Sequence, residues 1–482
     1  MAKKKIIIGI ALNSSMIWGG AAIREYDDTL KVIAAVSEPN ERSVRKGIIY
    51  NKDSMVQNLT NIINILEEKI GKKIVSAYVT MGGQSMCSQV NKISKDITGN
   101  DRVTQELVDE MYEENLNKDY SNAHIVDVIT QGFMINNVKE LNPVGIDAEH
   151  IIGQYLNIII REGNYSNVGQ VMDQVELPML KLKPLPVVIG DIILNDNDRR
   201  SGVVLVDMGS QTTSVSIYQD GLLQALYVLP MGGDNIVFDI MNERIDYDEV
   251  EELKHNKIQL TLDDNRKKED KDILIDNGER TIKQSLLNFI AKARVEEIVE
   301  NVWALIQRHD YRGLMKGLII TGGVSKMNGI QSIFESRTRF TQIQVRNVPT
   351  IKMQVPEDLM ETQVGNGHFN ALLAILNSGN ENCCQEQQYV PKVPELFPNG
   401  EIPLVLPSNK ATETTNETIG KDSENEQNPQ ERGTKREGLH TTKTPIIKEP
   451  TTKDSKKKNT FAQDLFKRLE KLGKAITNDD DE

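Results

Sequence analysis

The stretch 203–215 combines an apolar run, an aspartate and a turn of small polar residues. Residues 203–206 are valine or leucine throughout, which predicts a buried strand. Asp207 then lies at the carboxyl end of that strand, where open α/β sheets bind their ligands. The turn can direct N–H groups and hydroxyls to phosphate, with Asp207 beside a hydrated Mg²⁺. A hairpin turn without a ligand is the alternative; the turn residues are Gly209, Ser210, Gln211, Thr212 and Thr213.

The N-terminal part of the chain has the same plan. A strand pattern at 5–12 leads into the polar turn Asn13-Ser14-Ser15, followed by strand patterns at 16–23 and 30–36. Residues 203–229 likewise read as strand, turn, strand, Asp220-Gly221 hairpin and strand. Two copies predict two related α/β domains that face a shared cleft. A doubly wound enzyme without duplication is the alternative.

The other elements follow from periodicity. An amphipathic helix is predicted at 55–70 with Gly71 as its stop, and a strand at 74–81 ends in Gly82-Gly83. We expect an inserted subdomain with strands at 125–130 and 155–160 and a helix at 104–116. Short strands are expected within 246–278, around a charged loop at 263–272. A helix at 281–308, a strand at 316–323 running into Gly322-Gly323, and a last core helix at 369–376 complete the prediction.

Composition excludes several classes of protein. The net charge of -13 argues against nonspecific nucleic-acid binding, which needs a basic face. Three cysteines, two of them adjacent, form no disulfide framework and no zinc spacing, which favours a reducing compartment. No apolar run approaches the roughly 18 residues of a membrane span. The sequence therefore indicates a soluble or peripheral protein.

The C-terminal part has a different composition. Thr, Asn, Glu, Lys and Pro dominate after about residue 383, and no Phe, Tyr or Trp occurs between Phe397 and Phe461. Such a stretch cannot bury enough apolar surface to offset its ordering entropy, so we expect a disordered linker.

A basic amphipathic helix follows the linker. Residues 456–474 carry seven basic and two acidic side chains, and the apolar residues of 461–476 gather on one helix face. This pattern is typical of an interfacial membrane anchor, and each basic residue near an anionic leaflet adds on the order of 1 kcal/mol. A helix that docks on the protein's own body or on a partner is the alternative. The predicted membrane residues are Phe461, Leu465, Phe466, Leu469, Leu472, Ile476, Lys467, Lys471 and Lys474.

In this order, the motifs resemble those of FtsA, the actin-like bacterial cell-division family. The family's second phosphate motif is similar to 206–213, its Pro-x-Gly-Gly segment to 230–236, and its adenosine motif to 318–330. Segments 251–254 and 293–298 also match, and 129–133 and 142–146 resemble parts of the FtsA-specific subdomain. The resemblance covers roughly 5–378 plus the C-terminal helix.

The resemblance implies an α/β, actin-like (ribonuclease H-like) two-domain ATPase fold that binds ATP and Mg. The implied binding residues are Asn13, Ser14, Ser15, Asp207 (also the Mg contact, through water), Gly209, Ser210, Gln211, Thr212, Thr213, Gly232, Gly233, Glu251, Lys254, Gly322 and Gly323. The first phosphate motif departs from the family, because Ala11 stands where a carboxylate would order Mg²⁺ or water, and Asn13 replaces a glycine. Weak or absent hydrolysis is therefore expected, and no catalytic residue is assigned.

The implied function is that of a scaffold. FtsA proteins polymerise at the cytoplasmic face of the inner membrane at the division site, bind anionic lipids, anchor FtsZ filaments and recruit other division proteins; no nucleic-acid partner is expected. An active ATPase, or another actin-like adaptor such as a pilus-assembly protein, is the alternative. The expected domain order is a first domain at 1–83 and 163–201, the insertion at 84–162, a second domain at 202–235, 236–310 and 311–378, a linker at 379–458 and the helix with its acidic tail at 459–482.

The anchor gives the first testable prediction. Deletion of residues 459–482 should release the chain from anionic liposomes, and Leu469→Glu should weaken binding because it places a charge on the apolar face. Co-sedimentation measures both. Deletion of 479–482 alone, the acidic end, is the control and should leave the chain bound. Unchanged binding of the first two variants to anionic liposomes would contradict the anchor hypothesis.

Overall fold

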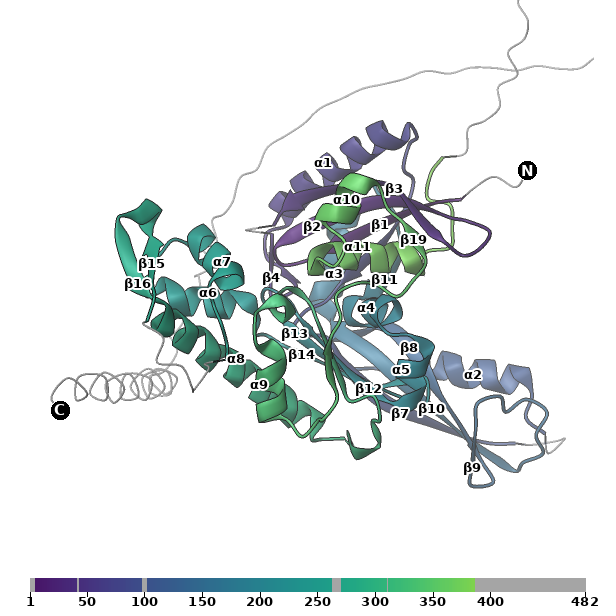
Figure 1. Cartoon of the computed structure of the whole chain (residues 1–482). Helices are drawn as coiled ribbons and strands as arrows, with labels where there is room; N and C mark the ends of the chain where they lie inside the picture. The colour runs from purple at the N-terminus through teal and green to yellow at the C-terminus, as the bar shows by residue number, and fades with distance from the viewer. Residues whose placement is uncertain (1–4, 41–42, 98–101, 262–269, 310, 386–482) are drawn as a thin grey trace, which may run out of the picture. The chain divides into compact units, whose positions relative to one another are not determined.

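The computed structural model describes residues 5–40, 43–97, 102–261, 270–309 and 311–385 (Figure 1). These residues belong to one compact unit, Met1–Pro391. The predictions for most of the linker and for the amphipathic helix at 459–482 lie outside the described residues. Within the described part of the chain, no helix has the length and apolar character needed to cross a membrane.

The first sheet has six strands in the order β11-β6-β1-β2-β3-β19. Strands β1, β2 and β3 pair antiparallel with one another, β6 and β11 continue parallel to β1, and β19 pairs parallel with β3. Every residue of β1 is buried, because helices cover both faces of the sheet. The strands are β1 (Ile6–Leu12), β2 (Met16–Arg24), β3 (Leu30–Pro39), β6 (Ala77–Met81), β11 (Met179–Pro184) and β19 (Met353–Gln354).

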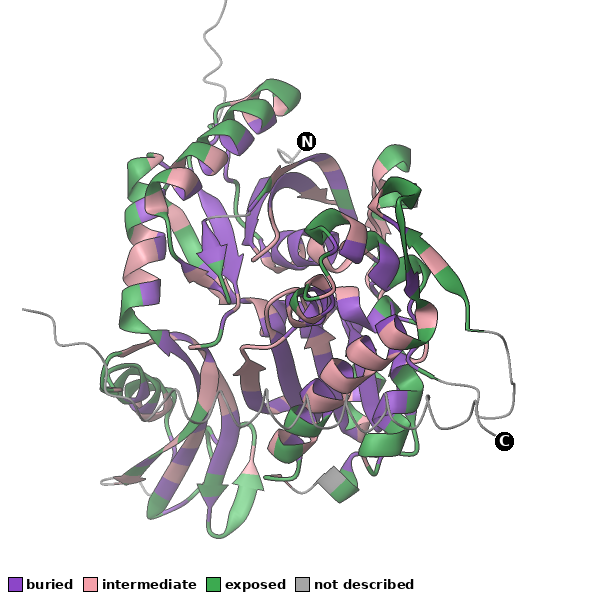
Figure 2. Ribbon diagram, turned by 90° about the vertical axis from the view of Figure 1, so that its left-hand side faces the viewer, coloured by how far each residue is buried: buried purple, intermediate pink, exposed green. Residues whose placement is uncertain are grey.

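Two helices cover this sheet, one on each side (Figure 1). Helix α1 (Lys52–Ile70) begins at Asn51, whose side chain accepts a hydrogen bond from the Ser54 N–H, and ends at Gly71 in the left-handed conformation, as predicted. Helix α11 (Gly367–Ser378) packs on β1 and β2 from the other face. Figure 2 shows the result: buried residues fill the strands, and the outer helix faces are exposed.

The second sheet repeats the first. Its order is β14-β13-β12-β17-β18, with β12, β13 and β14 antiparallel and β17 and β18 parallel to β12. The series β3-β2-β1-β6-β11 has the same order and the same directions, so the predicted duplication and the two-domain actin-like arrangement are confirmed. The strands are β12 (Val203–Met208), β13 (Thr213–Gln219), β14 (Leu222–Leu229), β17 (Leu318–Thr321) and β18 (Ile343–Val345).

The insertion forms a sheet of its own, in the order β7-β10-β8-β9, with a separate small core around Phe133 and Tyr155. It lies against the edge strand β14 of the second sheet, where the Gln131 amide donates to the Leu223 carbonyl at 2.8 Å and the Leu226 N–H donates to Ser88 Oγ at 2.8 Å. Its elements are β7 (Cys87–Asp96), α2 (Gln105–Leu116), β8 (Ala123–Ile135), β9 (Val138–Glu140) and β10 (His150–Arg161).

The chain crosses between the two sheets twice, and the crossings are tied together. Arg346 donates to Asp198 Oδ2 at 2.5 Å and to the Ile193 carbonyl at 3.0 Å, and the Thr350 N–H donates to the Ile192 carbonyl at 2.7 Å. Movement of one sheet relative to the other must therefore pivot near these bonds. The crossing and return elements are α3 (Glu162–Gln174), α4 (Leu185–Ile193), α5 (Asp196–Ser201) and α10 (Glu357–Thr362).

The outer part of the second domain differs from the prediction. Short strands were expected within 246–278, and one of them is present as β15 (Asp272–Ile275), but α7 (Tyr247–Asn256) is a helix with its own buried face at Val250 and Leu253. The helix expected at 281–308 begins later, because β16 pairs with β15 as an antiparallel ribbon. Residues 263–269 of the expected loop lie outside the described residues. The remaining elements are β4 (Val44–Arg45), β5 (Ile48–Ile49), α6 (Gly233–Met241), β15 (Asp272–Ile275), η1 (Asp276–Gly278), β16 (Arg280–Lys283), α8 (Gln284–Ile306), η2 (Tyr311–Gly313), η3 (Gly323–Lys326) and α9 (Ile330–Arg337).

The contact between α4 and β13 gives a stability prediction. A Cβ at Gly190 would lie 2.2 Å from Tyr218 Oη, a buried hydroxyl without a hydrogen-bond partner among the described residues. Gly190→Ala should lower the free energy of unfolding by about 1–3 kcal/mol through overpacking. Tyr218→Phe in the same chain should restore most of that loss, because it removes the clashing atom and breaks no hydrogen bond. Denaturant unfolding measures all three variants.

Gly169 of α3 is the matched control, since nothing lies within 4 Å of its Cβ position. Gly169→Ala should gain up to about 1 kcal/mol from helix propensity alone. A double variant no more stable than Gly190→Ala would contradict the proposed contact.

Candidate nucleotide site

One pocket lies where strands of both sheets end. The turns that follow the carboxyl ends of β1, β6, β12 and β17 all line it, as expected for ligand sites of open α/β sheets. Its empty volume is about 690 Å³, including the part open to solvent. Ten of the fifteen predicted binding residues line it: Asn13, Ser14, Ser15, Asp207, Gly209, Ser210, Gln211, Thr212, Gly322 and Gly323.

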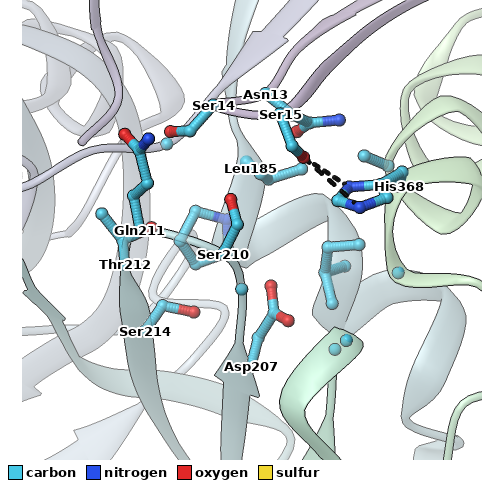
Figure 3. Close-up of a pocket in the computed structure, with 18 of the residues that line it drawn as sticks. Asn13, Ser14, Ser15, Leu185, Asp207, Ser210, Gln211, Thr212, Ser214 and His368 are labelled. Atoms are coloured by element: carbon cyan, nitrogen blue, oxygen red, sulfur yellow. Dashed lines mark hydrogen bonds between the residues drawn. The ribbon is translucent and has the colours of Figure 1, made fainter. Parts of the chain in front are cut away.

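Asp207 projects into this pocket from the end of β12 (Figure 3). Burial raises the pKa of its carboxyl group to about 6. Among the lining residues that the structure describes, it is the only carboxylate. A Cβ at Gly322 would lie 2.5 Å from Asp207 Oδ1, so the glycine leaves room for the carboxylate beside the turn. A partly desolvated carboxylate in this position is stabilised by a cation or by ordered water.

Hydroxyl groups surround the space above Asp207. Ser14 lies on one side, and Ser210, Thr212 and Ser214 lie on the other (Figure 3). The Gly209 N–H donates to the Thr212 carbonyl at 2.9 Å, which closes the turn after β12. Hydroxyls and turn N–H groups facing one another across a pocket can hold an anion such as phosphate.

Three predicted residues support the turn and lie outside the pocket lining. Thr213 is fully buried in β13, and its hydroxyl donates to the Met231 carbonyl at 2.8 Å. Gly232 and Gly233 lie behind the turn, where the Gly233 N–H donates to the Gly209 carbonyl at 2.9 Å. A Cβ at Gly232 would lie 2.5 Å from that same carbonyl oxygen, so no larger residue fits this position. These residues shape the turn that faces the ligand space.

Glu251 and Lys254 lie further out, on α7. Lys254 Nζ donates to Glu251 Oε1 at 2.6 Å, and the lysine side chain is almost completely buried. Neither residue lines the pocket, although Lys254 Nζ lies 3.3 Å from the Cβ position of Gly233. The pair borders the pocket from behind the Gly232-Gly233 segment.

Gln211 connects the turn to both domains. Its side-chain oxygen accepts from the Lys46 N–H at 2.7 Å, and its amide donates to Asp234 Oδ2 at 2.9 Å. Lys46 belongs to the β4–β5 hairpin of the first domain and Asp234 to α6 of the second. Burial raises the pKa of Asp234, and the bond from Gln211 opposes that rise. The Gln211 side chain therefore links the two domains at the edge of the pocket, and we call these two hydrogen bonds the Gln211 clasp.

Sequence reasoning missed part of the lining. His368 lies within hydrogen-bond distance of Ser15 Oγ, with its Nδ1 at 3.1 Å and its Nε2 at 3.3 Å (Figure 3). A Cβ at Gly367 would lie 3.1 Å from the Gly323 nitrogen, so the start of α11 touches the second glycine turn. The sequence feature that could have indicated this contact is the glycine-rich turn Gly365-Asn366-Gly367 before the last helix. The other residues missed are Leu12, Gly82, Gly83, Leu185, Pro186, Ile189, Ser214, Val228 and Ala371.

A resident metal cluster is not visible in the described part of the chain, which holds no group of three or more His, Cys, Asp or Glu side chains placed to bind an ion. Any cation at Asp207 would therefore share its coordination with water and with ligand oxygens. That is the usual situation of Mg²⁺ at a phosphate site.

The chain is similar to known cell-division proteins. The model of the family described as "Cell division protein FtsA" matches residues 204–370. The chain is 27% identical to the cell division protein FtsA of Porphyromonas gingivalis over 328 residues, which cover 66% of this chain and 68% of the relative. It is 26% identical to that of Bacillus subtilis, covering 64% and 71%.

Among solved structures, a chain of the "PilM-PilN type IV pilus biogenesis complex" matches with a TM-score of 0.51 and 13% identity. The match covers 77% of this chain and 97% of that one. At this identity the likeness concerns the fold alone.

The Gln211 clasp can be tested by hydrogen exchange. Gln211→Ala removes the acceptor of the Lys46 N–H, so peptides that contain Lys46 should exchange faster. Gln331→Ala is the matched control, because the Gln331 amide donates to Glu335 on its own helix α9, at 2.9 Å. Exchange around Lys46 that stays the same in Gln211→Ala would contradict the clasp.

Proposed function

The chain belongs to the FtsA family of actin-like cell-division proteins, and we propose that it binds ATP with Mg²⁺ in the pocket beside Asp207. One observation carries this proposal. The single carboxylate of the described lining faces two turns of hydroxyl and N–H donors across a space that both domains enclose. Such an arrangement provides the two opposite partners that a magnesium–phosphate group needs.

The residues present fit the nucleotide. Ser14, Ser210 and Thr212 would hold phosphate oxygens, and the Gly322-Gly323 turn would lie against the nucleoside because it carries no side chains. Asp207 would bind the hydrated Mg²⁺. When bound, Mg²⁺ neutralises phosphate charge. The chain itself supplies orientation and closes the pocket through contacts from both domains.

Binding is better supported than hydrolysis. Ala11 is fully buried within β1 and lies outside the pocket lining, so the first domain supplies no carboxylate there. Attack on the terminal phosphate requires a positioned water. With one carboxylate for both metal and water, we propose a nucleotide that acts mainly as a ligand of the closed form, stabilising it by preferential binding.

The cellular role follows from the family and from the C-terminal sequence. We propose that the chain polymerises at the cytoplasmic face of the inner membrane at the division site. There it anchors FtsZ filaments and helps recruit later division proteins. The basic amphipathic pattern at 461–476 supports attachment to anionic lipids. Because one such helix binds weakly, self-association would strengthen attachment through multivalency.

Titration calorimetry tests the nucleotide proposal. The full chain should bind ATP more tightly with Mg²⁺ than with EDTA, and Asp207→Asn should lose about tenfold or more of that Mg²⁺-dependent gain, because a charge-assisted contact disappears. Gly322→Val should weaken binding in both conditions, since its side chain would enter the space of Asp207. Asp248→Asn, exposed on α7, is the matched control. Absence of ATP binding by the full chain would overturn the proposal.

A phosphate-release assay separates the scaffold from the ATPase alternative. We expect slow turnover. Sustained turnover that Asp207→Ala abolishes would instead favour an active ATPase whose hydrolysis drives assembly turnover.

A further inference from the structure

His368 has no role in the nucleotide site described so far, yet it is the only basic side chain among the described residues that line the pocket. Its ring points to Ser15 in the first phosphate turn (Figure 3). Ser15 follows β1, and His368 is the second residue of α11. The two residues are 353 positions apart in the sequence, and the fold brings them together.

The start of α11 also favours an anion. This helix has twelve residues, and Gly367, His368 and Ala371 of its first turns line the pocket. N–H groups at a helix N-terminus lack partners within the helix and carry partial positive charge. Asn13 Nδ2, in the same pocket lining, is buried and has no hydrogen-bond partner among the described residues. An acceptor-rich ligand would satisfy both groups.

Without a ligand, the environment keeps His368 neutral. Burial is the main cause that lowers the pKa of its imidazole from the usual 6.5, and the nearby cations Lys326 and Lys254 lower it further. Glu251 is the one carboxylate that opposes them. The positive end of α11 acts in the same direction as the two lysines. Phosphate oxygens beside the ring act in the opposite direction, because a nearby negative charge stabilises the imidazolium and raises the pKa of His368.

We propose that His368 is a phosphate-contacting residue that takes up a proton when the phosphates of a nucleotide enter the pocket, so that nucleotide affinity depends on pH. This inference rests on the nucleotide binding proposed above. In the ligand-free pocket the neutral ring is held at Ser15 Oγ. With the ligand present, the imidazolium donates to a phosphate oxygen and Ser15 keeps the ring in place.

The direction of the pH effect follows from linkage. The free imidazole has a lowered pKa and the phosphate raises it, so the bound state holds more protons over the interval between the two values. Affinity should therefore be highest below the free pKa and fall as pH rises through the bound pKa. The loss should be about tenfold for each unit that separates the two pKa values.

Two other groups titrate in this range and must be separated from His368. Asp207 has a pKa of about 6, and Mg²⁺ binding would release its proton to solvent, which is the opposite effect on affinity. The terminal phosphate of ADP also titrates near neutral pH. Measurements with ADP in EDTA remove the contribution of Mg²⁺ binding at Asp207. Titration of the ADP phosphate contributes equally to the natural chain and to His368→Gln, so it cancels when the pH dependence of the two is subtracted.

The chain has only six histidines, which makes a direct measurement feasible. In a histidine-labelled full chain, the ring resonance lost in His368→Gln identifies His368, and its pKa is read from chemical shift with and without saturating ADP. We expect the pKa of His368 to be higher with ADP. Calorimetry in two buffers of different ionisation enthalpy should show proton uptake that His368→Gln removes.

His309→Gln is the matched control. Burial also lowers the pKa of His309, but that ring bonds to Tyr227 at 2.8 Å, outside the pocket lining. This variant should keep the proton uptake of the natural chain. If ADP binds and the His368 resonance titrates identically with and without it, the His368 inference is overturned and nucleotide binding stands. If neither ADP in EDTA nor ATP with Mg²⁺ binds at any pH between 6 and 8, both proposals fail.

Discussion

Four parallel-strand ends converge on one carboxylate, and most of the site depends on that constraint. Asp207 stands at the end of β12, level with Thr321 of β17, while β1 and β6 end on the opposite side of the pocket. Burial raises the pKa of Asp207, so the anionic form needs water or a cation nearby. The hydroxyls and N–H groups across the pocket cannot supply a cation. They favour an anion, and a magnesium–phosphate group satisfies both sides at once.

This convergence requires unusually close backbone contacts, which explains the glycines. Gly322 adopts a left-handed conformation, with φ 91°, between Asp207 and the Met208 carbonyl, and its Cβ would lie 2.5 Å from each. Gly367 brings α11 against that same turn. Three chain segments that are distant in sequence therefore meet at backbone distance. A side chain at Gly322 would displace Asp207, and a side chain at Gly367 would push the start of α11 away from the Gly322-Gly323 turn.

Much of the fold was predictable because it is local and repeated. The runs at β1 and β12, the turns after them and the Gly71 helix stop all follow from short patterns. His368 and the Gln211 clasp were not predictable, because their partners Ser15 and Lys46 lie 353 and 165 residues away. The helix α7 was missed because its buried face is short and its remaining residues are charged. Thr213 matched a phosphate motif, yet strand pairing turns its hydroxyl to Met231.

The insertion is hydrogen-bonded to the domain that it does not interrupt. By sequence it interrupts the first domain, yet its hydrogen bonds from Gln131 and to Ser88 are made with Leu223 and Leu226 of β14 in the second domain. The same strand continues to Val228, which lines the pocket. A change in pocket width that moves β14 must therefore either carry the insertion along or break these two bonds. The insertion also contacts the first domain, through β8 against β11 and α3, so it touches both of the domains that enclose the pocket.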